Sequence, residues 1–259
     1  MLHLIKAGLR VGGRIIGAYF AWIRKYAKNK DKYPFKERYL KVRNILQKVS
    51  KALDAEPHVE GLEKMPDETC LIVENHLSAY DPVLMISSFE KPCTFVAKKE
   101  LEKAPFAGKV ITGIDGLFLD RKDLKQSLRL MMKVEEDLKK KEKNWIIFPE
   151  GTRNKDTSHL VADFHHGTFR PAVKAGVPIV PVALFGTFRA LKKKPLFKKY
   201  PVFMKVLDPI YPEEYQNMST QELADLTRDR IQKVVSFELR ALDHKEMLGD
   251  KKYHFNEIL

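Results

Sequence analysis

The chain has 259 residues and only two cysteines, Cys70 and Cys93, whose spacing is not that of a metal site. This length fits one sizeable α/β domain plus an appendage, and such a core needs no disulfides. We therefore expect two reduced, buried thiols, as in a cytosolic protein. The sequence contains no internal repeat and no low-complexity tract, which excludes repeat architectures.

Almost all of the net charge of +13 lies at the N-terminal end. Residues 1–53 contain 14 Lys and Arg against two acidic residues, so this segment carries +12 and the remainder of the chain +1. A basic appendage indicates an anionic partner, either nucleic acid or a membrane surface. No recognised nucleic-acid-binding motif accompanies the charge, and we therefore expect a membrane partner and no nucleic acid.

The first segment has the pattern of an amphipathic helix. At 100° per residue its apolar residues fall on one side and its cations on the adjoining side. The apolar residues are Leu2, Ile5, Leu9, Ile16, Phe20 and Ile23; the cations are Lys6, Arg10, Arg14, Arg24 and Lys28. No uncharged stretch reaches the ~20 apolar residues of a spanning helix, and the charges do not fit a signal peptide. The pattern predicts a helix in the headgroup plane, with Tyr19 and Trp22 at that depth; the alternative is a helix packed on its own domain.

A second helix begins near Pro34. Its apolar residues recur at spacings of three and four, which gives one stripe. They are Phe35, Tyr39, Val42, Leu46, Val49 and Leu53. We therefore predict that residues 1–55 form a basic, amphipathic two-helix hairpin that binds membranes, and that residues 56–259 form the main domain.

Beyond residue 56, short β-type runs alternate with helical ones. The expected strands are Leu71–Glu74, Thr94–Ala97, Trp145–Phe148, Ile179–Leu184 and Val202–Val206. The expected helices are one capped near Asp123 with apolar residues from Leu124 to Leu138, one over Phe169–Ala175 that ends at Gly176, and a C-terminal one marked by Leu223, Leu226, Ile231, Val234 and Leu239. This alternation predicts an α/β fold with a mixed, mostly parallel sheet flanked by helices.

The most informative stretch is Asn75–Pro82, which follows the apolar run Leu71–Val73. Asp81 and Pro82 have the pattern of a helix start, with Asp81 as the N-cap. His76 then lies in a strand-to-helix turn, where open α/β sheets place their chemistry. An imidazole can take a proton from a hydroxyl, and a carboxylate on its other nitrogen fixes the tautomer. The alternative is an N-cap and a turn histidine without chemistry.

Three further clusters fall at strand ends: Phe118–Arg121, Phe148–Arg153 and Val177–Val182. The guanidinium groups of Arg121 and Arg153 suit a phosphate. The two prolines of the third cluster are typical of the start of a strand or of the edge of a sheet. Taken alone, each cluster has a plain structural explanation.

Together, the four clusters resemble the ordered sequence blocks of the glycerolipid acyltransferase family. The order is His-x4-Asp, Phe-x-x-Arg, Phe-Pro-Glu-Gly-Thr-Arg and Val-Pro-Ile-Val-Pro-Val, and the likeness is greatest to the bacterial-type 1-acyl-sn-glycerol-3-phosphate acyltransferases. The resemblance covers roughly residues 56–215. One position departs from the pattern: Asp115 stands where the second block usually has glycine, which is displaced to Gly116, whereas Phe118 and Arg121 still match.

The resemblance implies transfer of a fatty acyl group from a thioester to the sn-2 hydroxyl of lysophosphatidic acid, which gives phosphatidic acid. It implies that His76 is the general base and that Asp81 orients it, with Arg121 and Arg153 on the phosphate. The residues expected to bind or shape the acceptor site are Asn75, Lys98, Lys99, Arg121, Glu150, Gly151, Thr152 and Arg153. Lys98 and Lys99 also fit a solvated pair.

We expect no metal and no cofactor, and we read no metal site into His165 and His166. The donor is acyl-CoA or acyl-carrier protein, and the expected location is the cytoplasmic face of the cell membrane, peripheral or monotopic. The basic run 192–199 is more typical of a solvated loop than of a contact with membrane or an acidic carrier protein. The alternatives are a sister acyltransferase for another lyso-lipid or glycerol 3-phosphate, and a catalytically inactive membrane-binding protein.

Overall fold

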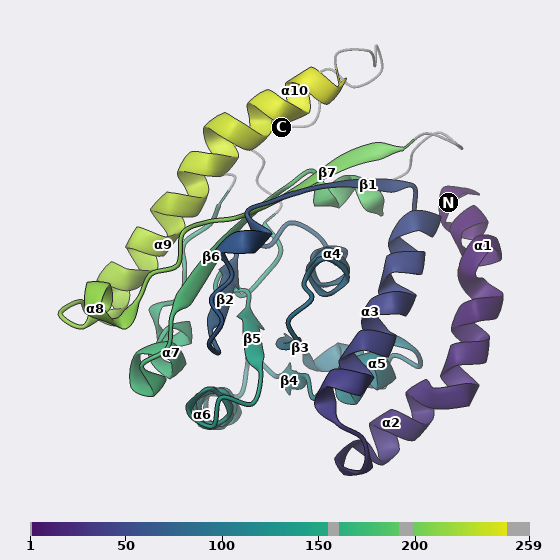
Figure 1. Ribbon diagram of the computed structural model, residues 1–259, viewed down its shortest axis with the longest axis horizontal. Helices are drawn as coiled ribbons and strands as arrows, with labels where there is room; N and C mark the ends of the chain where they lie inside the picture. The colour runs from purple at the N-terminus through teal and green to yellow at the C-terminus, as the bar shows by residue number, and fades with distance from the viewer. Residues whose placement is uncertain (1, 155–160, 192–198, 248–259) are drawn as a thin grey trace.

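The computed structural model describes residues 2–154, 161–191 and 199–247. A seven-stranded sheet forms the centre and helices cover both of its faces (Figure 1). The strands are β1 (Ala55–Glu60), β2 (Leu71–Glu74), β3 (Cys93–Lys98), β4 (Leu117–Leu119), β5 (Asn144–Ile147), β6 (Ile179–Phe185) and β7 (Tyr200–Val206). Their order is β1-β7-β6-β2-β5-β3-β4, and only the β6–β7 pair is antiparallel. The predicted mixed, mostly parallel sheet is therefore confirmed.

All five predicted strands are present, each within two residues of its predicted ends. The two strands that the sequence does not reveal, β1 and β4, lie at opposite edges of the sheet. Edge strands are covered less completely, so they need no continuous apolar run. β1 reads Ala-Glu-Pro-His-Val-Glu and β4 has only three half-buried residues, which explains why neither gives a recognisable pattern.

The prolines of the Val177–Val182 cluster only partly follow their prediction. Pro178 precedes β6 as expected, but Pro181 lies inside β6, between β2 and β7, and not at an edge. The antiparallel ladder to β7 begins at the next residue, Val182. Pro181 thus stands just outside that ladder, and its carbonyl still accepts a hydrogen bond from the Leu207 N–H at 2.9 Å.

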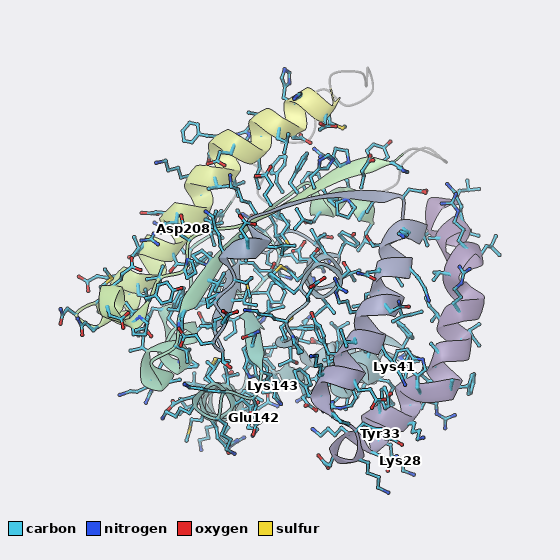
Figure 2. The ribbon with its side chains drawn as sticks, in the orientation of Figure 1. Lys28, Tyr33, Lys41, Glu142, Lys143 and Asp208 are labelled. Carbon is cyan, nitrogen blue, oxygen red and sulfur yellow. The ribbon has the colours of Figure 1, made fainter. Side chains whose placement is uncertain are left out.

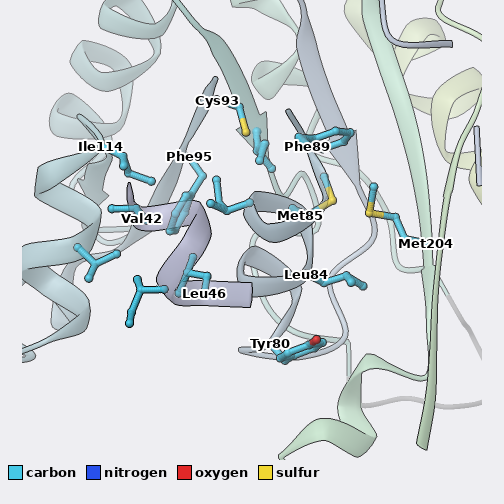
Figure 3. Close-up of a cluster of buried hydrophobic side chains, with 14 of the residues drawn as sticks. Val42, Leu46, Tyr80, Leu84, Met85, Phe89, Cys93, Phe95, Ile114 and Met204 are labelled. Atoms are coloured by element: carbon cyan, nitrogen blue, oxygen red, sulfur yellow. The ribbon is translucent and has the colours of Figure 1, made fainter. Parts of the chain in front are cut away.

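The N-terminal part consists of α1 (Leu2–Ala18), a π-helical turn (Tyr19–Ile23), α2 (Arg24–Lys28) and α3 (Phe35–Ala52), which begins after Pro34 as predicted. The apolar stripe of α3 packs on one face of the sheet together with α4 (Asp81–Ser88) and α5 (Ala107–Gly113). Figure 3 shows Val42 and Leu46 of α3 among side chains of α4 and β3. α3 therefore shares the core of the α/β domain.

α1 lies outside α3 and is the outermost helix on that side of the molecule (Figure 1). Ala7 and Val11 are buried against the domain. Lys6 and Arg10 contact the carboxylate of Asp54, at 2.8 and 2.5 Å, where α3 leads into β1. The opposite face is apolar and exposed; it comprises Leu2, Ile5, Leu9, Ile16 and Phe20. Five of the six predicted apolar residues thus face outward.

Ile23 is the exception, since it is buried with 1% of its surface exposed. The prediction assumed 100° per residue throughout, but the chain between Tyr19 and Ile23 is π-helical. A π turn takes one residue more than an α turn, which rotates the following side chains. Ile23 therefore turns inward, and Tyr19 and Trp22 are partly buried against the same core.

The other face of the sheet is covered by α6 (Leu124–Lys139), α7 (Arg170–Ala175), α9 (Thr220–Val234) and the π-helical turn Val235–Leu239, with α8 (Pro212–Tyr215) and α10 (Arg240–Met247) beside them. Asp123 caps α6 by accepting the Gln126 N–H at 2.8 Å, and Gly176 ends α7 at φ +61°, both as predicted. Only the later part of the α6 stripe is buried. Cys70 and Cys93 are free and buried, also as predicted.

Candidate active site

The predicted site residues follow four neighbouring parallel strands. Asn75 and His76 come after β2, Glu150–Arg153 after β5, Lys99 after β3 and Arg121 after β4. Because β2, β5, β3 and β4 are adjacent and parallel, their carboxyl ends meet at one edge of the sheet. At ~4.8 Å between strands, β4 lies roughly 14 Å from β2 along this edge.

The central pair is His76 and Asp81. His76 Nδ1 lies 2.8 Å from Asp81 Oδ2. The same oxygen accepts the backbone N–H groups of Leu77 and Ser78, each at 2.8 Å. A carboxylate oxygen that accepts two backbone N–H groups acts as an acceptor toward the imidazole as well, so we assign the proton to Nδ1, which leaves Nε2 as an acceptor. The Asp81 side chain is fully buried and the His76 side chain is 15% exposed.

Asp81 is not the N-cap of α4, contrary to the prediction. The helix begins at Asp81 itself, and Tyr80 is the capping residue without a side-chain cap. The carboxylate points back to the preceding turn, where it accepts the N–H groups of Leu77 and Ser78 and no N–H group of α4. Its hydrogen bonds therefore fix the histidine turn.

The loop after β5 fixes the backbone of His76 from the other side. Glu150 Oε1 accepts the His76 N–H at 2.8 Å, and the Asn154 N–H donates to the His76 carbonyl at 2.7 Å. Glu150 is only 5% exposed, and burial raises its pKa to about 7 although the bond from His76 lowers it. The His-x4-Asp block and the Phe-Pro-Glu-Gly-Thr-Arg block are thus joined through hydrogen bonds to the backbone of His76.

Two further contacts hold this turn. The ring of Phe148 lies against the imidazole of His76, with 4.4 Å between the ring centroids. Asn75 is buried and bonds the backbone of β6 twice: its Nδ2 donates to the Leu184 carbonyl at 3.0 Å and its Oδ1 accepts the Leu184 N–H at 2.8 Å. The turn therefore begins from a fixed point between two central strands.

Glu74, the last residue of β2, is a site residue that the sequence does not indicate. It is fully buried, and within the described part of the chain neither of its carboxyl oxygens has a hydrogen-bond partner. Burial, together with the nearby Asp81 and Glu150, raises its pKa well above the usual range. Three carboxyl groups thus surround the base of the histidine turn. The only sequence signal would have been an acidic residue that ends an otherwise apolar strand.

Gly151 occupies a position that favours glycine. Its φ is +66°, and a Cβ there would lie 3.1 Å from the imidazole of His165. Thr152 and Arg153, which follow it, are exposed. Arg121 is also exposed, two residues beyond β4.

The two lysines after β3 make surface ion pairs. Lys98 Nζ lies 3.0 Å from Glu100, and Lys99 Nζ lies 3.1 Å from Asp120, the neighbour of Arg121.

His166 Nδ1 lies 3.3 Å from Thr220 Oγ1. Among the described residues no group of three or more His, Cys, Asp and Glu is arranged to hold a metal ion. Residues 192–198 of the basic run lie outside the described part.

Asp115, the position that departs from the family pattern, has a positive φ of +58°. This left-handed conformation favours glycine and, next to it, Asn and Asp. The carboxylate is held by Arg38 of α3 at 2.9 Å and by Lys143 at 3.2 Å. Lys143 lies between α6 and the N-terminal helices (Figure 2).

Comparisons with known proteins show which family the chain belongs to. The sequence pattern of the acyltransferase family matches residues 56–185, from β1 to the end of β6. The chain belongs to the acyltransferase family. This confirms the resemblance seen in the four sequence blocks, all of which lie within the matched range.

Relatives span most of this acyltransferase. A probable 1-acyl-sn-glycerol-3-phosphate acyltransferase of Mycoplasma pneumoniae is 27% identical over 215 residues, which cover 78% of this chain and 79% of the relative. A 1-acyl-sn-glycerol-3-phosphate acyltransferase of Borreliella burgdorferi is 29% identical over 68% of this chain and 70% of its own. The crystal structure of the 1-acyl-sn-glycerophosphate (LPA) acyltransferase PlsC of Thermotoga maritima matches with a TM-score of 0.68 and 29% identity, over 89% of this chain and 88% of that one.

Proposed function

We propose that this acyltransferase moves a fatty acyl group from a thioester to the sn-2 hydroxyl of lysophosphatidic acid. The observation that carries the proposal is the 2.8 Å contact of His76 Nδ1 with the buried carboxylate of Asp81. It leaves Nε2 as the proton acceptor. The acceptor class follows the printed names of the relatives from Mycoplasma pneumoniae and Borreliella burgdorferi.

The reaction needs no nucleophile from the protein because the thioester is already activated. The acceptor hydroxyl oxygen attacks the thioester carbonyl carbon as its proton passes to His76 Nε2. The carbon–sulfur bond then breaks, and the thiolate takes the proton from the imidazolium and leaves as a thiol. Asp81 stabilises the imidazolium that forms in between. A placed base of this kind typically contributes 10²–10⁴ in rate.

The sheet edge supports a role for the two arginines in holding the phosphate of the acceptor. Arg153 follows the strand next to β2 and is exposed, as is Arg121 two residues beyond β4. Guanidinium groups form paired hydrogen bonds with phosphate oxygens. Gly151 lets the chain turn tightly two residues before Arg153.

The N-terminal helices would seat the enzyme on one leaflet of an anionic membrane. Support comes from the exposed apolar face of α1, which has Leu9 83% and Phe20 66% exposed, and from the charge of +12 over residues 1–53. Within the described ranges, none of the helices has both the length and the apolar character needed to span a bilayer. An interfacial helix fits these features, and the acceptor lipid would then enter the site from the leaflet.

The test is an assay of acyl transfer on vesicles that contain lysophosphatidic acid. Wild-type protein should release thiol and form phosphatidic acid, whereas His76→Ala should lose about 10²–10⁴ in rate. Equal rates for both proteins would contradict the assignment of His76. A panel of acceptors that includes other lyso-lipids and glycerol 3-phosphate identifies the acceptor, and acyl-CoA and acyl-carrier protein are compared as donors.

A further inference from the structure

A groove runs between α1 with its π-helical turn on one side and α3 on the other. Its volume is about 600 Å³, which lies within the usual range of ligand sites. The groove is separate from the sheet edge that carries His76, because all of its lining residues belong to the N-terminal helices. It follows the junction of the two helices, on the side of α1 that faces α3, whereas the exposed apolar residues lie on the opposite side of α1.

The inner surface of the groove is apolar. Ala21 and Trp22 line it from the π turn, and Leu40 and Ile45 line it from α3. Leu40 is 43% exposed, although the main apolar stripe of α3 is packed on the sheet. An exposed leucine beside a half-buried tryptophan gives a surface that suits a hydrocarbon chain.

Cations surround this apolar surface. Arg14, Lys41 and Lys48 line the groove, and no acidic residue does. Lys41 is already engaged, since its Nζ donates to Tyr26 Oη at 2.6 Å. Among the described residues no ion pair joins Arg14 or Lys48 to a carboxylate, so both charges are available to a ligand.

A ligand that matches both features carries one anionic head and at least one long apolar chain. A free phosphate ion would leave the apolar surface unused. On α1 the groove is lined by Arg14 and Ala18, which lie across the helix from the exposed side chains of Ile16 and Phe20, so the groove is a feature separate from the apolar face.

We propose that this groove binds one anionic phospholipid of the bilayer, with its phosphate at Arg14 and Lys48 and one acyl chain along Trp22 and Leu40. The inference rests on the proposed membrane seat of α1 and adds a discrete lipid site to it. Phosphatidic acid is itself an anionic phospholipid, so the reaction product belongs to the class that the groove binds. The protein would then be retained on leaflets rich in such lipids.

The experiment measures quenching of Trp22 by phospholipids with brominated acyl chains. The second tryptophan, Trp145, is fully buried in the sheet and out of reach of the bromines. Vesicles of phosphatidylcholine and phosphatidylglycerol are prepared with bromine on one or the other lipid, at the same overall composition. Wild-type protein should be quenched more by the brominated anionic lipid than by an equal share of the brominated neutral lipid.

Two variants test the two features of the groove. Arg14→Gln with Lys48→Gln should lower the affinity for phosphatidylglycerol about tenfold and abolish the preferential quenching. Ala21→Phe should abolish it by filling the groove, with the charge unchanged. The controls are Lys36→Gln with Lys51→Gln, two exposed cations outside the groove, and Gly13→Phe, where a Cβ meets no atom within 4 Å. Both controls should keep the preference.

The outcomes separate this inference from the proposed membrane seat. If the wild type does not sediment with anionic vesicles at all, the membrane seat is wrong and the lipid site falls with it. If it sediments but both brominated lipids quench equally, the lipid site is overturned and the membrane seat stands. Equal loss of preference in the groove variants and in their controls also overturns it, because general charge or bulk would then explain the effect.

Discussion

Arg38 of α3 binds Asp115 through two parallel hydrogen bonds, Nη1 to Oδ1 at 3.0 Å and Nη2 to Oδ2 at 2.9 Å. Arg38 Nη1 also donates to the Gly113 carbonyl at 2.5 Å, and the side chain is almost fully buried. This bond joins the N-terminal helices to the segment that leads through β4 to Arg121. A position where the family usually has glycine therefore provides, in this chain, an ionic link between α3 and the segment that precedes β4.

Asp115→Asn should lower the free energy of unfolding by about 3 kcal/mol, because it leaves the buried guanidinium of Arg38 without its counter-charge. Burial acts to raise the pKa of Asp115, but Arg38 and Lys143 outweigh it and hold the pKa below the usual 3.8. The stabilisation is thus present above pH 3.8 and is lost as the pH falls through the lower value in the folded protein. Urea denaturation at pH 7 measures the change.

The control for this prediction is Asp67→Asn. Asp67 pairs with Lys91 at 2.8 Å but is fully exposed, so solvent screens the pair. We expect no measurable change in the urea midpoint for this variant. If both variants shift the midpoint equally, the Arg38–Asp115 link has no special weight.

Asp81→Asn should reduce kcat by about 10² or more and leave the KM for lysophosphatidic acid nearly unchanged. The side chain keeps its shape but no longer stabilises the imidazolium of His76. The measurement is steady-state kinetics on vesicles, with thermal unfolding to establish that the variant is folded. A folded variant with wild-type kcat would exclude the role assigned to Asp81.

Glu150→Gln should flatten the pH dependence of stability. Burial raises the pKa of Glu150 to about 7, so folding favours its protonated form. The contribution of Glu150 to the free energy of unfolding is fully present below its ordinary pKa of 4.5. This contribution is lost as the pH rises through the folded-state pKa of about 7. The difference in unfolding free energy between wild type and variant should change by about 3 kcal/mol across this window. Glutamine can still accept the His76 N–H, and Glu63→Gln at an exposed position is the control, for which no such change is expected.

Arg153→Gln should raise the KM for lysophosphatidic acid about tenfold or more, because a charge-assisted hydrogen bond to the phosphate is lost. The KM for the thioester donor should stay the same. Monoacylglycerol, which lacks the phosphate, serves as the comparison acceptor and should react equally with both proteins. An equal loss for both acceptors would point to a role of Arg153 in the fold or in the chemistry.

Leu9→Asp and Ile23→Asp should behave differently, although the sequence places both residues on one helix face. Leu9 is 83% exposed, so its replacement should leave the urea midpoint unchanged and strongly reduce sedimentation with anionic vesicles. Ile23 is 1% exposed, and a buried carboxylate there should prevent stable folding. Vesicle binding by folded Leu9→Asp at the wild-type level would contradict the assigned membrane face.

The local pattern of the sequence determined the sheet, the histidine turn and the outward face of α1. Apolar runs mark the central strands because these are covered on both sides, and parallel strands bring the residues that follow them to one edge. His76 and Asp81 are five residues apart, so a single turn is enough to pair them. The family resemblance added the roles, which no spacing alone provides.

Only the tertiary structure decided the contacts between distant segments. Arg38 and Asp115 are 77 residues apart, and Glu150 reaches the backbone of His76 across 74 residues. Such pairs depend on how strands and helices pack, and they leave no periodic signal in the chain. The same holds for Ile23, which a π turn rotates inward, and for the burial of Glu74, because burial depends on what covers a residue and not on its neighbours in sequence.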